Sequence, residues 1–250
     1  MKKMSQIPYL IILLVVSLML SACSSDDKKS DTAEGAYELA KTFEKEERYE
    51  EAIKRYQEIR NKFPYSKYAL LAELSVADAH FKQESYLEAQ VAYQSFKDLH
   101  PKHPQIDYVT FRLADSFYRQ LPESVDRDLT LASSAILYFD EVVTQYPNSA
   151  QTKEAIEKKE AALKMLAEKE KYIADFYFKN ETYDSALSRY EGLYSKYETQ
   201  GYGPVALKQA AICAFKLGER DKAKKYLSDL TSKFPNSDEA AAAKSALSTL

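Results

Sequence analysis

Alanines, aromatic residues and prolines recur at fixed spacings along this chain, and the pattern predicts pairs of packed helices. In each copy an alanine is followed four residues later by an aromatic residue or leucine, and a proline comes eight residues after that. The complete copies are Ala52, Tyr56 and Pro64; Ala89, Tyr93 and Pro101; Ala135, Phe139 and Pro147; and Ala223, Leu227 and Pro235. A further copy has Ala186 and Tyr190, but Glu198 stands in place of the proline. Small residues let two helices approach closely, and the larger residue fills the space toward the next pair.

The spacing between copies points to one kind of repeat. The proline positions 64, 101, 147, 198 and 235 are 37, 46, 51 and 37 residues apart. An uninterrupted tetratricopeptide repeat has about 34 residues, so the longer spacings indicate inserted loops. Twelve residues before the alanine, where the first helix of such a repeat has a small residue, stand Ala40, Ala77, Ala174 and Ala211. In the third copy Ala114 takes this position only if residues 120–130 bulge out as a loop.

The sequence therefore predicts an all-α fold, a superhelical solenoid of about five tetratricopeptide (helix-turn-helix) repeats over residues 34–250. We expect the repeats at 34–69, 70–104, 105–150, 151–204 and 205–240. Proline cannot continue a helix and keeps the preceding residue out of the α conformation, so four second helices should end at Phe63, His100, Tyr146 and Phe234. Residues 150–179 contain no glycine or proline and predict one helix of up to about 45 Å. Gly201, Gly203 and Pro204 predict a loop.

The N-terminus has the features of an export signal followed by a lipid-attachment site. Lys2 and Lys3 precede an apolar run at 9–20, which is shorter than the about 20 apolar residues that span a bilayer. The run ends in Leu20-Ser21-Ala22-Cys23, which resembles the lipobox of bacterial lipoproteins. By that resemblance residues 1–22 are a signal peptide, Cys23 is acylated (a palmitate-type lipid anchor), and residues 23–33 form a flexible tether; the alternative is a chance cysteine after an ordinary signal peptide. Ser24 follows the cysteine at the position where an inner-membrane retention signal would have aspartate. The lipoprotein resemblance therefore implies an outer-membrane protein, lipid-anchored on the periplasmic face.

Composition excludes several classes of function. Removing residues 1–22 takes away only Lys2 and Lys3, so 35 basic residues fall to 33 against 38 acidic ones, a net charge of −5. Nucleic-acid binding is therefore not expected. Cys213 is then the only thiol of the repeat region, and its apolar surroundings predict a buried structural cysteine. His100 and His103 lie in a proline-rich turn without a cysteine or carboxylate inside it, so we expect no metal site. The sequence also has no glycine-rich phosphate loop and no nucleophile elbow, so we expect no cofactor beyond the lipid on Cys23, no catalytic residue and no enzyme.

The first helices of a tetratricopeptide array line its concave groove. Residues one, four and five places after the first-helix alanine would face that groove, and they repeat the order Asp, aromatic, basic. These residues are Asp78, Phe81 and Lys82; Asp115, Tyr118 and Arg119; and Asp175, Phe178 and Lys179. Such a lining would suit an extended peptide. The alternative is an ordinary solvated helix face.

Four segments go beyond a generic repeat. They are residues 61–68 (NKFPYSKY), 103–109 (HPQIDYV), 126–128 (DRD) and 146–149 (YPNS). In order and spacing they resemble the BamD family, lipoproteins of the outer-membrane β-barrel assembly machinery. The resemblance implies binding to the POTRA region of the BamA barrel protein, contact with accessory Bam lipoproteins, and reception of unfolded outer-membrane β-barrel substrates. The alternative function from the same compartment is a tetratricopeptide lipoprotein scaffold for pilus or secretin assembly.

The resemblance also implies site residues. A family arginine that contacts the POTRA domain corresponds to Arg189, in a stretch that also holds Glu191; the alternative for Arg189 is a solvated helix arginine. Substrate binding by the N-terminal repeats is assigned to Phe63, Tyr65 and Tyr68, with Asp107 and Tyr108 beside them. For these five the alternative is packing between repeats.

Overall fold

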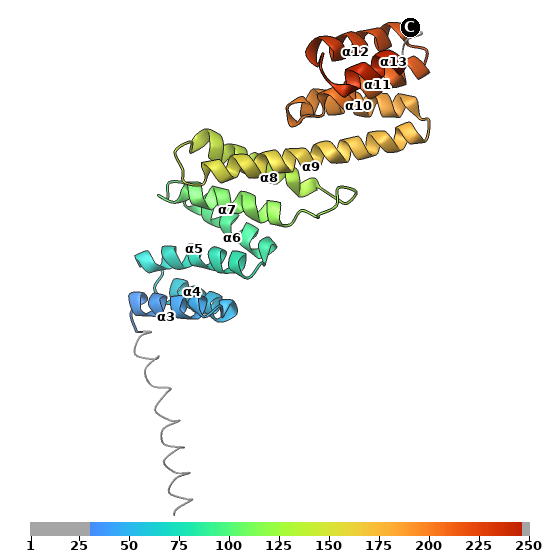
Figure 1. Cartoon of the computed structure of the whole chain (residues 1–250). Helices are drawn as coiled ribbons and strands as arrows, with labels where there is room; N and C mark the ends of the chain where they lie inside the picture. Colours follow the sequence, from blue (N-terminus) through green and yellow to red (C-terminus); the bar gives the residue numbers. More distant parts are fainter. Residues whose placement is uncertain (1–30, 247–250) are drawn as a thin grey trace, which may run out of the picture. The chain divides into compact units, whose positions relative to one another are not determined.

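The computed structural model describes residues 31–246, and all regular structure within that range is helical (Figure 1). The expected signal peptide, the acylated Cys23 and most of the tether lie outside the described residues. The chain divides into two compact units, and the division falls between Pro101 and Lys102.

From residue 31 onward, the first unit contains two helix pairs. Helices α3 (Ala33–Lys45) and α4 (Tyr49–Lys62) form one pair, and α5 (Lys67–Lys82) and α6 (Tyr86–Leu99) form the other. Each helix packs mainly against the next one in the chain, which is the arrangement of a solenoid.

Up to residue 246, the second unit contains three helix pairs and a last helix. The pairs are α7 (Ile106–Arg119) with α8 (Thr130–Gln145), α9 (Thr152–Lys179) with α10 (Tyr183–Tyr197), and α11 (Gly203–Lys216) with α12 (Arg220–Lys233). A short 3₁₀ turn, η1 (Glu198–Gln200), precedes α11, and α13 (Asp238–Ala246) packs against α11 and α12. Within the described residues the prediction of all-α tetratricopeptide-type repeats is confirmed.

The spaced alanines and aromatic residues are the core. Ala40, Ala77, Ala114, Ala174 and Ala211 of the first helices are fully buried, as are Ala52, Ala89, Ala135, Ala186 and Ala223 of the second. The large residues Tyr56, Tyr93, Phe139 and Tyr190 are also 0% exposed. Leu227 of the last pair is only partly buried, and it packs against a cluster that includes Leu230 of α12 and Ala240 of α13. The two periodic positions therefore set the helix contacts, as the spacing predicted.

Local sequence signals place most helix ends. The residues before the four prolines are the C-caps of α4, α6, α8 and α12, with ψ of 54 or 55° outside the α region. Residues 120–129 form the inserted loop of the third pair, and the segment without glycine or proline forms the 28-residue helix α9. The loop expected around Gly203 and Pro204 is wrong in its extent, because both residues begin α11. Proline is tolerated there since the first turn of a helix has no partner for its N–H.

Tight turns join the two helices of four pairs, and no sequence pattern predicted their geometry. Two residues after the end of the first helix, the backbone has a positive φ. These residues are Glu47 (60°), Glu84 (62°), Glu181 (58°) and Gly218 (79°). Only the last of these is a glycine, the residue that adopts this conformation without strain. The turn is thus a common structural element of four repeats, and the inserted loop replaces it in the third.

Candidate substrate- and partner-binding surfaces

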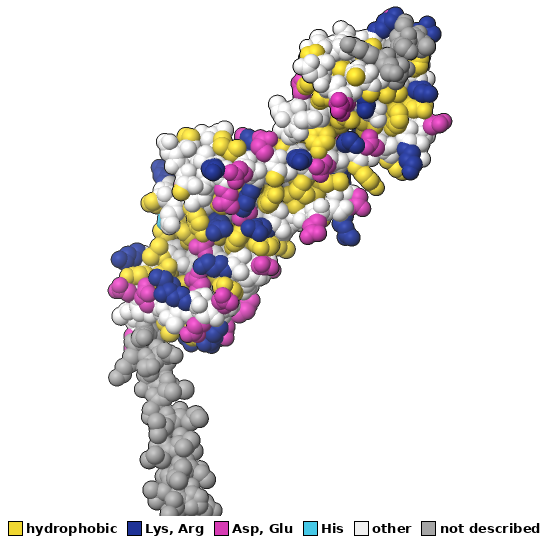
Figure 2. Space-filling model, viewed as in Figure 1, with side chains coloured by type: hydrophobic (Ala, Val, Ile, Leu, Met, Phe, Trp, Pro, Cys, Tyr) yellow, Lys and Arg dark blue, Asp and Glu magenta, His cyan; other side chains and the backbone are white. Residues whose placement is uncertain are grey.

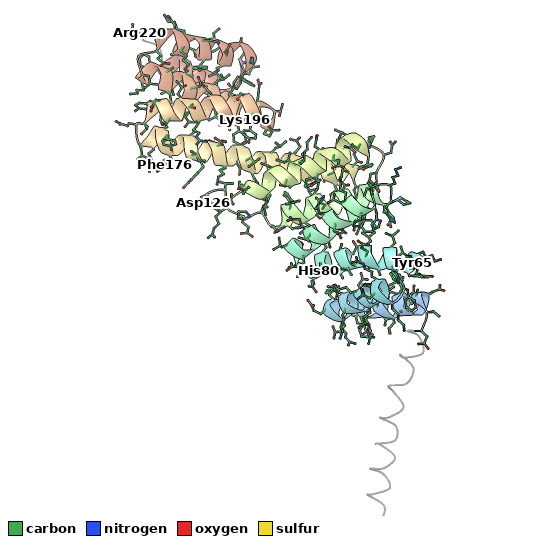
Figure 3. All side chains as sticks on the ribbon, turned by 180° about the vertical axis from the view of Figure 1, so that it is seen from behind. Tyr65, His80, Asp126, Phe176, Lys196 and Arg220 are labelled. Atoms are coloured by element: carbon green, nitrogen blue, oxygen red, sulfur yellow. The ribbon has the colours of Figure 1, made fainter. Side chains whose placement is uncertain are left out.

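Phe63, Tyr65 and Tyr68 lie at the turn between α4 and α5, but they have different environments. Phe63 is the C-cap of α4 and packs, partly buried, against the core of the first unit. Tyr68, in the first turn of α5, packs against the same core, with its ring 5.6 Å from that of Tyr37. Its hydroxyl bonds to Glu34, which raises the pKa of Tyr68. Tyr65 is fully exposed; Figure 3 labels it near the start of α5.

An open depression of about 460 Å³ surrounds Tyr65. Arg60, Lys67, Glu73 and His100 also line it. A Glu73 carboxylate oxygen lies 3.2 Å from Nε2 of His100, and the other lies 3.9 Å from a guanidinium nitrogen of Arg60. The depression therefore combines an exposed aromatic ring with basic side chains around one carboxylate.

Phe63 lines a different, smaller depression. It has a volume of about 110 Å³ and lies between α3 and α4, with Leu39 and Ile59 as apolar walls and Arg55 and Lys62 on its rim. Phe63 and Tyr65 flank Pro64 in the sequence, yet each lines its own depression. The predicted aromatic set is thus not a single pocket.

Asp107 and Tyr108 lie in the first turn of α7, in the second unit. Nε of Arg112 donates to the Tyr108 hydroxyl at 3.2 Å, and the same guanidinium lies over the Tyr108 ring, 5.4 Å from its centroid. Tyr108 therefore contacts Arg112, one turn further along α7. The parts predicted for Asp107 and Tyr108 in substrate binding stay predictions.

Arg189 and Glu191 both lie on α10 but face opposite sides of it, because residues two apart on a helix differ by about 200°. A guanidinium nitrogen of Arg189 donates to Glu170 of α9 at 3.2 Å. Glu191 instead accepts from the Tyr226 hydroxyl and lies 3.2 Å from Nζ of Lys222, both on α12. Burial and the bond to Glu191 raise the pKa of Tyr226. The two residues therefore do not form one patch: Arg189 keeps 44% of its side chain exposed, while Glu191 links α10 to α12.

The aspartates expected to line a peptide groove have partners inside the protein. The Tyr93 hydroxyl donates to Asp78 at 2.6 Å, and the Tyr190 hydroxyl donates to Asp175 at the same distance. In the first pair Tyr56 donates to Glu44, also at 2.6 Å. Burial, then the adjacent carboxylate, raise the pKa of Tyr56 and Tyr190. These carboxylates thus hold the two helices of a pair together, a role that neither interpretation of the sequence anticipated.

Cys213 and the charged surface offer no further candidate binding site among the described residues. Cys213 is fully buried in α11, as predicted, and burial raises the pKa of its thiol to about 12. Charged side chains of both signs are interspersed over the helices on the face shown in Figure 2. Between residues 31 and 246 no helix is long and apolar enough to cross a membrane. The same residues place no three potential metal ligands together.

Stacked helix pairs with buried alanines, aromatic knobs and open surface depressions define a tetratricopeptide-repeat protein, a class that acts by binding other proteins. The family model YfiO, described as an outer membrane lipoprotein, matches residues 29–227. The chain therefore belongs to this family, which includes the BamD proteins. It is 29% identical over 245 residues to outer membrane protein assembly factor BamD of Neisseria meningitidis serogroup A, covering 90% of this chain and 92% of the relative. Identity to BamD of Rickettsia prowazekii is 30% over 233 residues, covering 90% of both chains.

Solved structures give more distant similarities. The TPR2AB domain of yeast Sti1 in its complex with pHSP90 has a TM-score of 0.42 and 16% identity, covering 86% of this chain and 84% of that one. Pseudomonas aeruginosa pilF has a TM-score of 0.38 and 16% identity, covering 86% and 82%. Similarity at this level does not bear on function.

Proposed function

We propose that this chain is a lipid-anchored scaffold of the outer-membrane β-barrel assembly machinery, attached through Cys23 to the periplasmic face of the outer membrane. In this role it binds the POTRA region of a BamA-like barrel protein, contacts accessory Bam lipoproteins and receives unfolded barrel substrates. The observation that carries the proposal is the family match over residues 29–227. Nothing in this role requires a catalytic residue, since a repeat scaffold acts through its binding surfaces.

For substrate reception the depression around Tyr65 has suitable chemistry. An exposed aromatic ring next to Arg60 and Lys67 favours an extended segment that carries both an aromatic side chain and a carboxylate. A substitution of Tyr65 separates binding from stability, because its side chain is fully exposed and its removal takes nothing from the core. Phe63 and Tyr68 pack on the core of the first unit, so their truncation lowers stability as well.

The test is binding of a labelled peptide from the C-terminus of a barrel protein, measured by fluorescence anisotropy on the lipidated protein in detergent. We expect Tyr65→Ser and Arg60→Ala to weaken binding by about tenfold, the equivalent of about 1.4 kcal/mol. Tyr172→Ser is the matched control, because Tyr172 is an exposed tyrosine of α9 in the second unit. If Tyr65→Ser binds the peptide as tightly as Tyr172→Ser does, the depression lined by Tyr65 is not part of the substrate site.

For POTRA binding the half-exposed Arg189 offers a planar fork to a carboxylate. Its pairing with Glu170 is partly exposed and contributes about 0–1 kcal/mol, so Arg189→Glu leaves the fold intact. We expect this variant to lose binding to a purified POTRA domain. Exchanging the two charges, with Arg189→Glu and Glu170→Arg together, restores the ion pair between α9 and α10 but not the partner contact. Recovery of POTRA binding in the exchanged protein would show that Arg189 acts only within the helix pair.

A further inference from the structure

The third helix pair departs from its neighbours in how it neutralises one buried carboxylate. In the second and fourth pairs, the aspartate after the first-helix alanine accepts a hydrogen bond from a tyrosine fifteen residues later, on the second helix of the same pair. The last pair has neither group, with Ile212 and Leu227 at these positions. The third pair has the aspartate, Asp115, but Phe139 stands where the tyrosine would be. Phe139 has no hydroxyl to donate.

Asp115 is nevertheless almost completely buried, with 1% of its side chain exposed. A buried charge is costly unless it is paired and hydrogen-bonded. The partner comes from the next pair: Nζ of Lys158, on α9, lies 2.6 Å from Oδ1 of Asp115. Lys158 is itself only 15% exposed, and Arg112 and Arg119 of α7 lie further away, at 3.7 and 3.6 Å. The Lys158 ammonium also lies over the Phe111 ring, 5.3 Å from its centroid.

We propose that the Asp115–Lys158 ion pair is a positioning device that replaces the missing tyrosine and fastens α9 to the third helix pair. In the second and fourth pairs the aspartate joins two helices of one pair, whereas here it joins two successive pairs. The joined helix is α9, whose N-terminal half packs on α8 and whose C-terminal half packs on α10. One buried charge therefore adds to the apolar packing that holds the start of α9 on the third pair.

The test compares Lys158→Met with Lys159→Met in the full chain. Lys159 is the adjacent lysine of α9 and pairs at the similar distance of 2.8 Å with Asp140, but that aspartate is 52% exposed. Removing one partner of a buried pair is far more damaging than removing one partner of an exposed pair. We expect amide hydrogen exchange in the first turns of α9 to accelerate by about 100-fold in Lys158→Met and by less than about fivefold in Lys159→Met. Similar exchange in the two variants would overturn the proposal.

Rescue distinguishes this role from simple loss of packing. Phe139→Tyr in the Lys158→Met background returns a hydroxyl at the position used by Tyr93 and Tyr190, so we expect it to restore most of the lost protection. Phe139→Tyr alone measures the cost of fitting the hydroxyl into a fully buried site. A second rescue, Asp115→Asn with Lys158→Met, removes the buried charge and should also protect α9 better than Lys158→Met alone. Failure of both rescues would contradict the proposal.

Discussion

The hydroxyl of Tyr190 should contribute measurably to the pairing of α9 and α10. Tyr190 is fully buried, and its hydroxyl donates to Asp175 at 2.6 Å. A hydrogen bond to a charged group contributes about 1.5–3 kcal/mol. The other carboxylate oxygen of Asp175 keeps its contact with Lys171 at 2.5 Å, and the side chain is 42% exposed. Water can therefore replace part of the lost bond, and we expect Tyr190→Phe to cost about 1.5 kcal/mol, at the lower end of that range.

Thermal unfolding followed by circular dichroism measures this cost. For a protein of this size about 1.5 kcal/mol lowers Tm by about 3–6 °C. Relative to wild type, amide hydrogen exchange should accelerate more in α10 than in α4. Tyr65→Phe is the matched control, because it removes the hydroxyl of a fully exposed tyrosine and should change stability by less than about 0.5 kcal/mol. An equal Tm for Tyr190→Phe and Tyr65→Phe would refute the assignment of a stabilising role to the tyrosine–carboxylate bond.

Three further predictions concern the pH dependence of stability, one turn with positive φ, and one close contact of α11. Burial and the neighbouring carboxylates hold the pKa of Tyr56 and Tyr190 above its usual value of about 10. The unfolded chain thus loses these protons first, so these two tyrosines leave stability unchanged below about pH 10 and lower it above, as urea midpoints measured with tyrosinate absorbance will show; a midpoint that rises above pH 10 would contradict this. Glu181 has a φ of 58°, so Glu181→Gly should relieve strain and stabilise by about 0.5 kcal/mol in urea unfolding, after the entropy cost of glycine; a loss of stability would argue against strain. A Cβ on Gly203 would lie 2.7 Å from Cζ of Phe234, so Gly203→Ala should lower stability by about 1–3 kcal/mol, and Phe234→Leu in that background should recover part of it; no recovery would locate the damage elsewhere.

The features that the sequence predicted are those set by local chemistry. The helix ends before Pro64, Pro101, Pro147 and Pro235 follow from the proline ring itself. The long helix α9 follows from the absence of helix-breaking residues between 150 and 179. The buried alanine positions follow from a spacing that only close helix packing requires. These signals were sufficient for the fold class within the described residues.

The features that the sequence missed depend on which side chains meet across helices. Asp78 was expected to face a bound peptide, and its bond to Tyr93 depends on the register between α5 and α6. Arg189 and Glu191 were assigned to one partner contact because they share a stretch that resembles the family's, but the helix turns them to different neighbours. Glu84 adopts a left-handed conformation that glycine usually signals, so its turn carried no marker in the sequence.

The central claim, a scaffold of β-barrel assembly, is tested most directly by affinity purification of the tagged, lipidated protein from membranes, with mass spectrometry of what it retains. Wild type is compared with Arg189→Glu, and with the exchanged pair Arg189→Glu, Glu170→Arg as the control for helix pairing. The account predicts that wild type retains a POTRA-containing barrel protein and that both variants lose it. Retention of pilus or secretin subunits in place of the barrel protein would contradict the account.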